Sequence, residues 1–537
     1  MANSNWERVV QEKRSQQARA IADIRAKLGA EFDNAGPVDD INDIEIFTSK
    51  ISNGELSSEE VTKACIARAI KAHEKTNCLT EVLFSEAIDH AKRLDEYMSK
   101  HGKPIGPLHG VPMTLKDQFN VRGHDTTLGY TSRAFKPASD DSVLVRMLRK
   151  LGAVIIAKTN LPQSIMWCET ENPIWGLTTN PMNPRYTPGG STGGESALLY
   201  MKGSFMGWGT DIGGSIRIPA HMMGLYGLKP SSARLPYYGV PVSTEGQEHV
   251  PSSIGPLART LPSIHKVMKN VIEDEPWTKD CRCAPIPWQT GVYEETLSRK
   301  LTIGILIDDG VVRPHPPIER IVRHAAELLK ANGHEVIEWS PDLHPECIEL
   351  MDMYYTADGG EDIRRDVEAG GEPFIPHVEK LVNRGKAISV YDYWQLNKRR
   401  TALQQAYLEK WNKAISPSTG RRVDVVLMPV MPHPAVPHKA CRWVGYTKIW
   451  NFLDYTALVV PGGKVEDGDC EVAWQYEPRS AMDEWNAQVW RDNKADMAAM
   501  GLPVGVQIAG RKFEEEKVLA VGRVLDDLLA TVRTQPR

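Results

Sequence analysis

The 537-residue sequence contains few cysteines, no excess of basic residues and no long apolar run. Its 8 cysteines are mostly isolated along the chain, which is typical of a reducing compartment. The formal net charge of -5 excludes the basic excess that drives nucleic-acid binding. Neither the charged N-terminus nor any later segment has the apolar length of a signal peptide or a bilayer span. We therefore expect a soluble, cytoplasmic protein with no membrane span and no nucleic-acid partner.

Groups of potential metal ligands are also scarce. Cys281 and Cys283 form the only closely spaced cysteine pair, and a zinc site would need a second pair. His433, His438 and Cys441 lie near one another in the sequence, but the two prolines between the histidines disfavour a regular helix that could carry ligands. The sequence therefore predicts neither a metal site nor another cofactor.

The first hundred residues have the pattern of helices. Residues 1–28 resemble a charged surface helix, and Ser57 with Glu60 forms a capping box that predicts a second helix start. Apolar residues at helical spacing then continue through residues 61–75 and again through 85–100. We expect residues 1–54 to form an N-terminal helical segment that precedes the main domain.

From residue 105 onward, short apolar runs alternate with helical patterns. The strand-like runs occupy residues 110–119, 153–160, 205–211, 301–308, 334–340, 423–430 and 503–510. The helical patterns occupy residues 141–152, 316–333, 389–415 and 514–532. This alternation predicts the α/β class, with a largely parallel sheet that carries helices on its faces. Because the elements are interleaved over the whole length, we expect one large domain, with mobile lids or insertions at 358–376 and 461–483.

The segment 188–220 is rich in glycine and contains two glycine–serine turns, GGSTGG and GTDIGGS. Glycines at a strand end allow positive φ values and bring backbone N–H groups close to a ligand, and a following helix N-terminus adds further donors. Such a cradle can bind a phosphate or a transient oxyanion. The phosphate interpretation is weak, because Glu195 stands where a Walker motif needs lysine and the glycine spacing misses the dinucleotide pattern.

An oxyanion fits the second turn better. The N–H groups of four consecutive residues could converge on one point, namely Ile212, Gly213, Gly214 and Ser215. Preorganised donors of this kind stabilise the negative charge that develops in an acyl-transfer transition state. A serine at the same turn is then a candidate nucleophile, and a nucleophilic serine needs a base.

No histidine of the sequence stands in a motif that suggests this base. We expect His221 to pack within a helix and His109 to be a loop residue bonded to backbone. Lys116 lies late in an apolar, strand-like run, where burial would lower its pKa and favour the neutral amine that can accept a proton. The alternative is a strand-end lysine that points to water and pairs with Asp117, and the residues alone do not decide between the two.

At these residues the sequence resembles the amidase signature family. GGSTGGESALL at 189–199 and GTDIGGSIRIPA at 209–220 are similar to the family signature, and GVPMTLKDQFNVRG at 110–123 is similar to its lysine segment. Further similar segments follow in the family order, so the resemblance covers about residues 55–530. It implies a single large α/β domain at 55–530, built on a twisted mixed sheet surrounded by helices, with a C-terminal tail at 531–537.

The resemblance also implies roles for single residues. Ser215 matches the acylated nucleophile, Ser191 the bridging serine that follows a cis peptide bond, and Lys116 the terminal base. Their spacing is similar to that of the fungal acetamidase and fatty acid amide hydrolase branch. The other matched positions are the oxyanion residues Ile212, Gly213 and Gly214, the substrate-contacting Ile165, and the loop-bracing Asp211 and Arg217. Thr192 replaces a serine found in many members, and we expect little effect because both residues carry a hydroxyl.

The activity implied by the resemblance is hydrolysis of a carboxamide to a carboxylate and ammonia or an amine, through an acyl-enzyme on Ser215. A glutamine amidotransferase-type subunit, an acyltransferase and a catalytically inactive binding protein are alternatives on the same fold. The expected partner is a small-molecule amide substrate, and the sequence leaves a homodimer open. The identity of the amide does not follow from the sequence.

Overall fold

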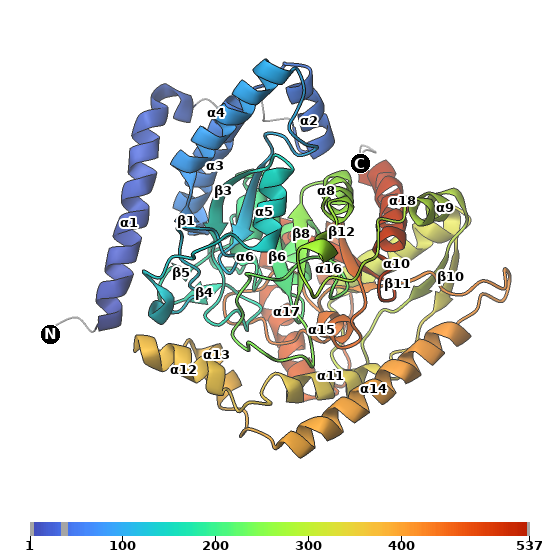
Figure 1. Ribbon diagram of the computed structural model, residues 1–537. Helices are drawn as coiled ribbons and strands as arrows, with labels where there is room; N and C mark the ends of the chain where they lie inside the picture. Colours follow the sequence, from blue (N-terminus) through green and yellow to red (C-terminus); the bar gives the residue numbers. More distant parts are fainter. Residues whose placement is uncertain (1–4, 34–40, 534–537) are drawn as a thin grey trace.

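A computed structural model describes residues 5–33 and 41–533 of the chain. Its centre is an eleven-stranded sheet in the order β1-β3-β2-β6-β8-β7-β12-β13-β11-β9-β10 (Figure 1). These strands are β1 (Leu79–Val82), β2 (Pro112–Lys116), β3 (Val154–Thr159), β6 (Met206–Asp211), β7 (Tyr226–Lys229), β8 (Ser253–Ala258), β9 (Thr302–Ile305), β10 (Glu335–Glu338), β11 (Val425–Pro429), β12 (Ala457–Lys464) and β13 (Pro503–Ala509). A small second sheet pairs β4 (Glu171–Asn172) with β5 (Gly176–Leu177).

Helices surround this sheet (Figure 1). They are α1 (Asn5–Leu28), α2 (Ile44–Ser52), α3 (Ser58–Thr76), α4 (Phe84–His101), α5 (Val143–Lys150), α6 (Gly193–Tyr200), α7 (Arg217–Met223), α8 (Leu261–Glu273), α9 (Thr290–Ser298), α10 (Pro316–Ala331), α11 (His344–Tyr354), α12 (Glu361–Gly370), α13 (Pro376–Val382), α14 (Val390–Lys413), α15 (Gly445–Phe452), α16 (Asp467–Glu471), α17 (Ala481–Met500) and α18 (Glu515–Arg533). Short 3-10 helices lie at Gly29–Phe32, Thr131–Arg133 and Pro276–Thr278.

Several predictions of local structure are confirmed. The capping box of Ser57 and Glu60 is present at the start of α3, and the charged N-terminal pattern forms α1. The predicted tail at 531–537 begins within the last turn of α18, and residues 534–537 lie outside the described residues. Within residues 5–33 and 41–533, no helix has both the length and the apolar character needed to cross a membrane.

The sheet is mixed, so the expectation of a largely parallel sheet is wrong. Parallel pairs join β2 to β3 and β6, and join β9 to β10 and β11. The middle of the sheet, from β6 through β8, β7, β12 and β13 to β11, is antiparallel. Of these central strands β7, β8 and β12 were not recognised from sequence, because glycine and proline interrupt their apolar runs.

Two of the predicted loops contain regular structure. Residues 358–376 include the whole of α12, and residues 461–483 include the end of β12, the short α16 and the start of α17. The helix α12 escaped recognition because its sequence is mostly charged, with only Ile363 and Val367 buried at a spacing of four residues. These two side chains join a hydrophobic cluster that also contains Ile165.

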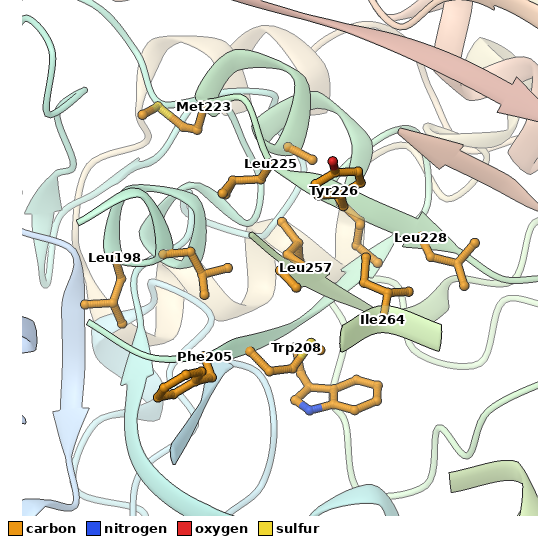
Figure 2. Packing of buried hydrophobic residues seen from close by; sticks show 14 of the residues in the cluster. Leu198, Phe205, Trp208, Met223, Leu225, Tyr226, Leu228, Leu257 and Ile264 are labelled. Atoms are coloured by element: carbon orange, nitrogen blue, oxygen red, sulfur yellow. The ribbon is translucent and has the colours of Figure 1, made fainter. Parts of the chain in front are cut away.

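The largest hydrophobic core lies against the centre of the sheet. Figure 2 shows side chains from α6, β6, β7, β8 and α8 that pack together there, including Leu198, Trp208, Leu228, Leu257 and Ile264. Trp208 on β6 has no solvent-exposed surface. Because this strand is tightly packed, the turn that follows it starts from a fixed position.

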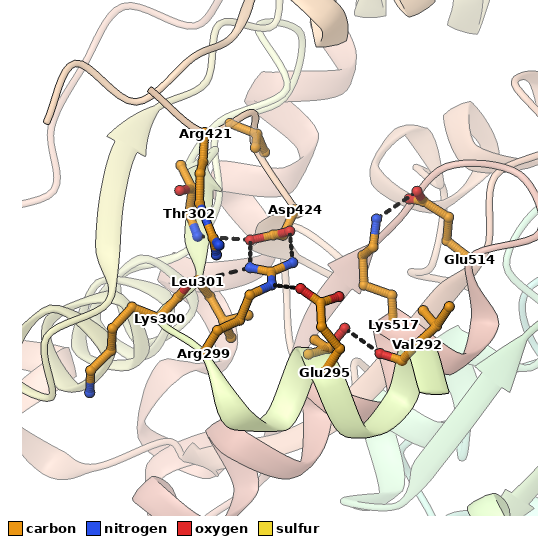
Figure 3. Close-up of polar contacts among 12 residues, drawn as sticks. Val292, Glu295, Arg299, Lys300, Leu301, Thr302, Arg421, Asp424, Glu514 and Lys517 are labelled. Atoms are coloured by element: carbon orange, nitrogen blue, oxygen red, sulfur yellow. Dashed lines mark hydrogen bonds and ion pairs between the residues drawn. The ribbon is translucent and has the colours of Figure 1, made fainter. Parts of the chain in front are cut away.

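A polar cluster joins β9 and β11, which lie near the β10 edge of the sheet (Figure 3). Arg299 donates to both carboxylate oxygens of Asp424, at 2.9 and 2.6 Å, and Asp424 also accepts the N–H of Thr302. These bonds join the start of β9 to the start of β11. The parallel pair is therefore held by side-chain bonds at its start as well as by the backbone hydrogen bonds between the strands.

Candidate active site

The candidate site lies where β2 and β6 end. These neighbouring strands run parallel, so Lys116 at the end of β2 and Asp211 at the end of β6 lie at the same edge of the sheet. The first glycine–serine turn leads into α6, and the second turn leads from β6 into α7. The carboxyl edge of parallel strands is a common position for binding sites in α/β folds.

Lys116 is fully buried and its amine faces the first turn. A hydrogen bond joins Lys116 Nζ to Ser191 Oγ at 2.6 Å. Burial lowers the pKa of the lysine to about 7, although the carboxylates of Asp211 and Asp117 raise it. The alternative of a water-facing lysine paired with Asp117 is wrong: the Asp117 carboxylate instead accepts backbone N–H groups of the 127–128 turn.

A second hydroxyl, which no local sequence pattern marks, binds the same amine. Lys116 Nζ donates to Thr210 Oγ1 at 3.0 Å, and that hydroxyl donates to Gln118 Oε1 at 2.7 Å. Since the Thr210 proton is engaged by Gln118, the threonine can only accept from the lysine. In its neutral form the amine can therefore direct an N–H to Thr210 and its lone pair to Ser191.

Ser191 is 1% exposed and follows a cis peptide bond from Gly190, as the family resemblance implied. Glycine is required at position 190, because a Cβ there would lie 2.6 Å from the carbonyl oxygen of Glu169. The next residue, Thr192, donates its N–H to the carbonyl oxygen of Ser215 at 3.2 Å. This bond ties the two serine turns together.

The hydroxyl of Thr192 is buried and makes no hydrogen bond within the described residues. Its methyl group packs close to Gly209 on β6. The substitution of threonine for serine therefore places an extra methyl group in the core behind the site and adds no polar contact.

The second turn presents fewer free N–H groups than the sequence suggested. Gly214 donates its N–H to Asp211 Oδ1 at 2.8 Å, so the expectation that this group faces a ligand is wrong. Asp211 captures it because the turn folds back over the end of β6. The N–H groups of Ile212, Gly213 and Ser215 donate to no protein acceptor among the described residues.

Two carbonyl groups of the same turn accept hydrogen bonds from side chains of later segments. Tyr355 Oη donates to the carbonyl oxygen of Ile212 at 3.1 Å, and Thr447 Oγ1 donates to that of Gly213 at 2.6 Å. In a trans peptide the N–H points away from the carbonyl of the same unit. The bond from Tyr355 therefore sets the direction of the Gly213 N–H.

Asp211 and Arg217 form a completely buried ion pair under the turn. Arg217 Nη2 lies 2.8 Å from Asp211 Oδ1, and Asn451 donates to the same carboxylate at 2.9 Å. Burial by itself would raise the pKa of Asp211, but the charge and hydrogen bonds of Arg217 hold it well below its ordinary value. The contacts agree with the bracing positions implied by the resemblance, whereas Asn451 could not be found from sequence.

Ser215 is half-buried and opens on a pocket of about 200 Å³. Ile165, Ile212 and Gly213 line the same pocket, so Ile165 lies at a position that could contact a ligand. Ile165 has a φ of 60°, in the left-handed region that β-branched residues rarely adopt. This backbone turns its side chain into the hydrophobic cluster beside the pocket.

The other polar candidates lie elsewhere or are engaged. His109 accepts a backbone N–H from Ile105, and His221 lies within α7, between a carbonyl of His433 and the N–H of Gly505, so both expectations are confirmed. Burial lowers the pKa of His221 to about 4.

The possible metal ligands do not come together either. His438 contacts a backbone carbonyl, and the thiols of Cys281, Cys283 and Cys441 form no disulfide. Across the described ranges, no group of three or more potential ligand side chains is placed to hold a metal ion.

Comparison with known proteins agrees with this geometry. A family model described as Amidase matches residues 60–519. The chain is 52% identical to Amidase 1 of Gibberella moniliformis over 98% of this chain and 99% of that relative. It is 41% identical to an acetamidase of Emericella nidulans over 91% of this chain and 89% of the relative. A solved structure of fatty acid amide hydrolase aligns with a TM-score of 0.85 and 31% identity, covering 98% of this chain and 94% of that one.

These matches extend across the whole sheet as well as the two serine turns, so they are not limited to a short motif. The predicted α/β fold, one large domain with a mixed sheet and surrounding helices, is confirmed. The chain therefore belongs to the amidase signature family, whose members are hydrolases that act on amides.

Proposed function

We propose that Ser215, Ser191 and Lys116 form a catalytic triad that hydrolyses a carboxamide to a carboxylate and ammonia or an amine. The observation that carries the proposal is the buried contact of 2.6 Å between Lys116 Nζ and Ser191 Oγ. A lysine held there with a pKa of about 7 is neutral in about half of the molecules at neutral pH, so it can act as a base. The proposed catalytic domain keeps the bounds 55–530.

The proton path runs inward from the pocket. Neutral Lys116 accepts the proton of Ser191, which accepts the proton of Ser215 as Ser215 Oγ bonds to the amide carbon. The tetrahedral intermediate then collapses, the C–N bond breaks, and Ser191 returns a proton to the leaving nitrogen. Ser191 regains a proton from protonated Lys116, which becomes neutral again. Water then attacks the ester carbon while its proton passes through Ser191 to Lys116, and the ester C–O bond breaks as a proton returns through Ser191 to Ser215 Oγ. The bond from Lys116 to Thr210 supports this order, since it keeps the amine oriented throughout.

The oxyanion of the intermediate would be held by the N–H groups of Ile212, Gly213 and Ser215. Gly214 is omitted, because its N–H donates to Asp211. Its role is to let the turn fold back, for which its φ of 134° requires glycine. Donors fixed in this way stabilise the developing charge without reorganisation during the reaction.

Tyr355→Phe is expected to lower kcat by roughly three- to tenfold, because the loss of one neutral hydrogen bond costs about 0.5–1.5 kcal/mol. The variant would free the Ile212 carbonyl and loosen the Gly213 N–H that faces the oxyanion. Steady-state kinetics on a small amide should show the change mainly in kcat. Tyr354→Phe is the matched control, since Tyr354 Oη donates to Asn397 instead. Equal kinetics for the two variants would contradict the positioning role of Tyr355.

The proposed function is tested by labelling the active serine. A fluorophosphonate should modify the purified chain at Ser215, as located by peptide mass spectrometry, and should stop ammonia release from a small amide. Ammonia release without any partner chain would separate a free-standing amidase from an amidotransferase subunit. Labelling at another serine, or unchanged ammonia release after complete labelling of Ser215, would refute the assignment.

A further inference from the structure

The pocket in front of Ser215 carries more positive than negative charge. Three basic side chains line it, Arg384, Arg442 and Lys448, against the single carboxylate of Asp352, which leaves a formal charge of +2. Lys448 is buried and lies 2.7 Å from Asp352 Oδ1, and Arg384 lies 3.6 Å from the same oxygen. One carboxylate thus faces two cations.

Arg442 has no carboxylate within ion-pair distance among the described residues. Its guanidinium stacks on Trp485, 3.5 Å from the ring centroid, which holds the charge beside the pocket. Much of the remaining lining is apolar, with Ile165, Trp167 and Trp443 among its members. The pocket therefore combines an apolar wall with cations that an uncharged amide would leave unused.

A neighbouring cavity of about 530 Å³ has the opposite sign. It shares Met166, Ile212 and Tyr355 with the Ser215 pocket, so the two cavities adjoin at these residues. Its charged lining residues are Glu245, Asp358, Glu361, Asp362 and Arg365. A negative group on the substrate is repelled from that side and attracted to the side of Ser215, because complementary potentials select both partner and orientation.

We propose that the preferred substrate is a compact amide that carries a carboxylate, bound in the Ser215 pocket near Arg384 and Arg442. This inference rests on the amidase function proposed above and narrows its substrate class. With the amide carbon at Ser215 Oγ, the apolar part of the molecule contacts the wall at Ile165 and Trp167. The volume of about 200 Å³ is below the 300–1,000 Å³ typical of larger ligands, which favours a small molecule.

The kinetic test compares adipamic acid with hexanamide, which have the same chain length and differ in the terminal carboxylate. An exposed ion pair contributes at most about fivefold in affinity, and the carboxylate can pair with two arginines. We therefore expect kcat/KM to be about tenfold higher for adipamic acid. The double variant R384Q/R442Q should lower kcat/KM for adipamic acid about tenfold more than for hexanamide, so that the preference disappears. Lys386→Gln is the control. Lys386 is an exposed cation two residues after Arg384, and it does not line the pocket.

A second pair places the charge on the leaving-group side, N-acetylglycine against N-ethylacetamide. Loss of the anion preference in R384Q/R442Q for either pair supports the proposal and shows which side of the amide enters the pocket. No anion preference in either pair, or a preference that Lys386→Gln removes equally well, would overturn it.

Binding to Ser215→Ala tests the charge preference without catalysis. Calorimetry should show adipamic acid binding about tenfold more tightly than hexanamide, with the difference lost when R384Q/R442Q is added and reduced by 0.5 M salt. If the wild-type chain hydrolyses hexanamide but adipamic acid binds to Ser215→Ala no better than hexanamide, the charge inference fails alone. If no amide is hydrolysed but adipamic acid still binds better, the catalytic proposal fails and the anion site stands.

Discussion

Ser215→Ala is expected to lower kcat/KM for amide hydrolysis by at least about ten-thousand-fold, since a serine hydrolase that loses its nucleophile can lose roughly a million-fold in kcat. Alanine has no oxygen that can form the ester bond to the acyl group, so no acyl-enzyme can be made. The backbone N–H of residue 215 and the bond from Thr192 to its carbonyl remain, so the turn should keep its shape. Ammonia release from a small amide at high enzyme concentration measures the residual rate.

The control for this variant is Ser298→Ala, at the end of α9 and away from the site. It should retain the wild-type rate, and both variants should unfold at temperatures close to that of the wild type. A loss of less than tenfold in Ser215→Ala, with the fold intact, would mean that another group attacks the amide.

Lys116→Met is expected to lower the rate of acylation by about a hundred- to ten-thousand-fold, the usual contribution of a positioned general base. Methionine keeps the length and burial of the side chain but cannot accept a proton. Ser191 would lose its bond of 2.6 Å and Thr210 its donor, so the proton of Ser215 would have no acceptor of suitable pKa. Single-turnover kinetics, with the acyl-enzyme detected by mass spectrometry, isolates this step.

Lys158→Met is the matched control. Lys158 is a fully buried lysine on the adjacent strand β3, and its amine donates to Thr126 and the backbone of Asp125. Loss of that amine should reduce the free energy of unfolding but leave the acylation rate of the folded protein within a few-fold of wild type. Equal acylation defects in the two lysine variants would indicate a general effect of removing a buried charge.

The sequence contained the side chains of the proposed catalytic triad but little of what supports them. Ser191 and Ser215 lie in glycine-rich turns, and Lys116 lies in an apolar strand, so local patterns together with the family resemblance identified all three. Thr210, which holds the lysine amine, is an ordinary strand residue until the pairing of β2 with β6 is known. Tyr355 and Asn451 lie more than a hundred residues from the turn that they contact, and no local signal marks them.

The prediction that Gly214 faces the oxyanion failed for a similar reason. Consecutive N–H groups in a glycine turn need not point the same way, and the Asp211 carboxylate captures one of them. The charged part of the pocket lining was also beyond sequence reasoning, because Arg384 and Arg442 come from separate segments that only the fold brings together. The proposed specificity thus depends on tertiary contacts, whereas the residues of the proposed triad lie in motifs that the sequence shows.

If Lys116 acts as a neutral base, the rate of acylation must depend on the pH at which this lysine loses its proton. The lysine accepts a proton only when uncharged, so kcat/KM should rise with pH through about pH 7, where burial places its pKa. Lys116→Met should abolish this rise and leave a low rate that is flat across the same range. A wild-type rate that stays constant or falls between pH 5 and about pH 9, or a rise that persists in Lys116→Met, would exclude Lys116 as the base.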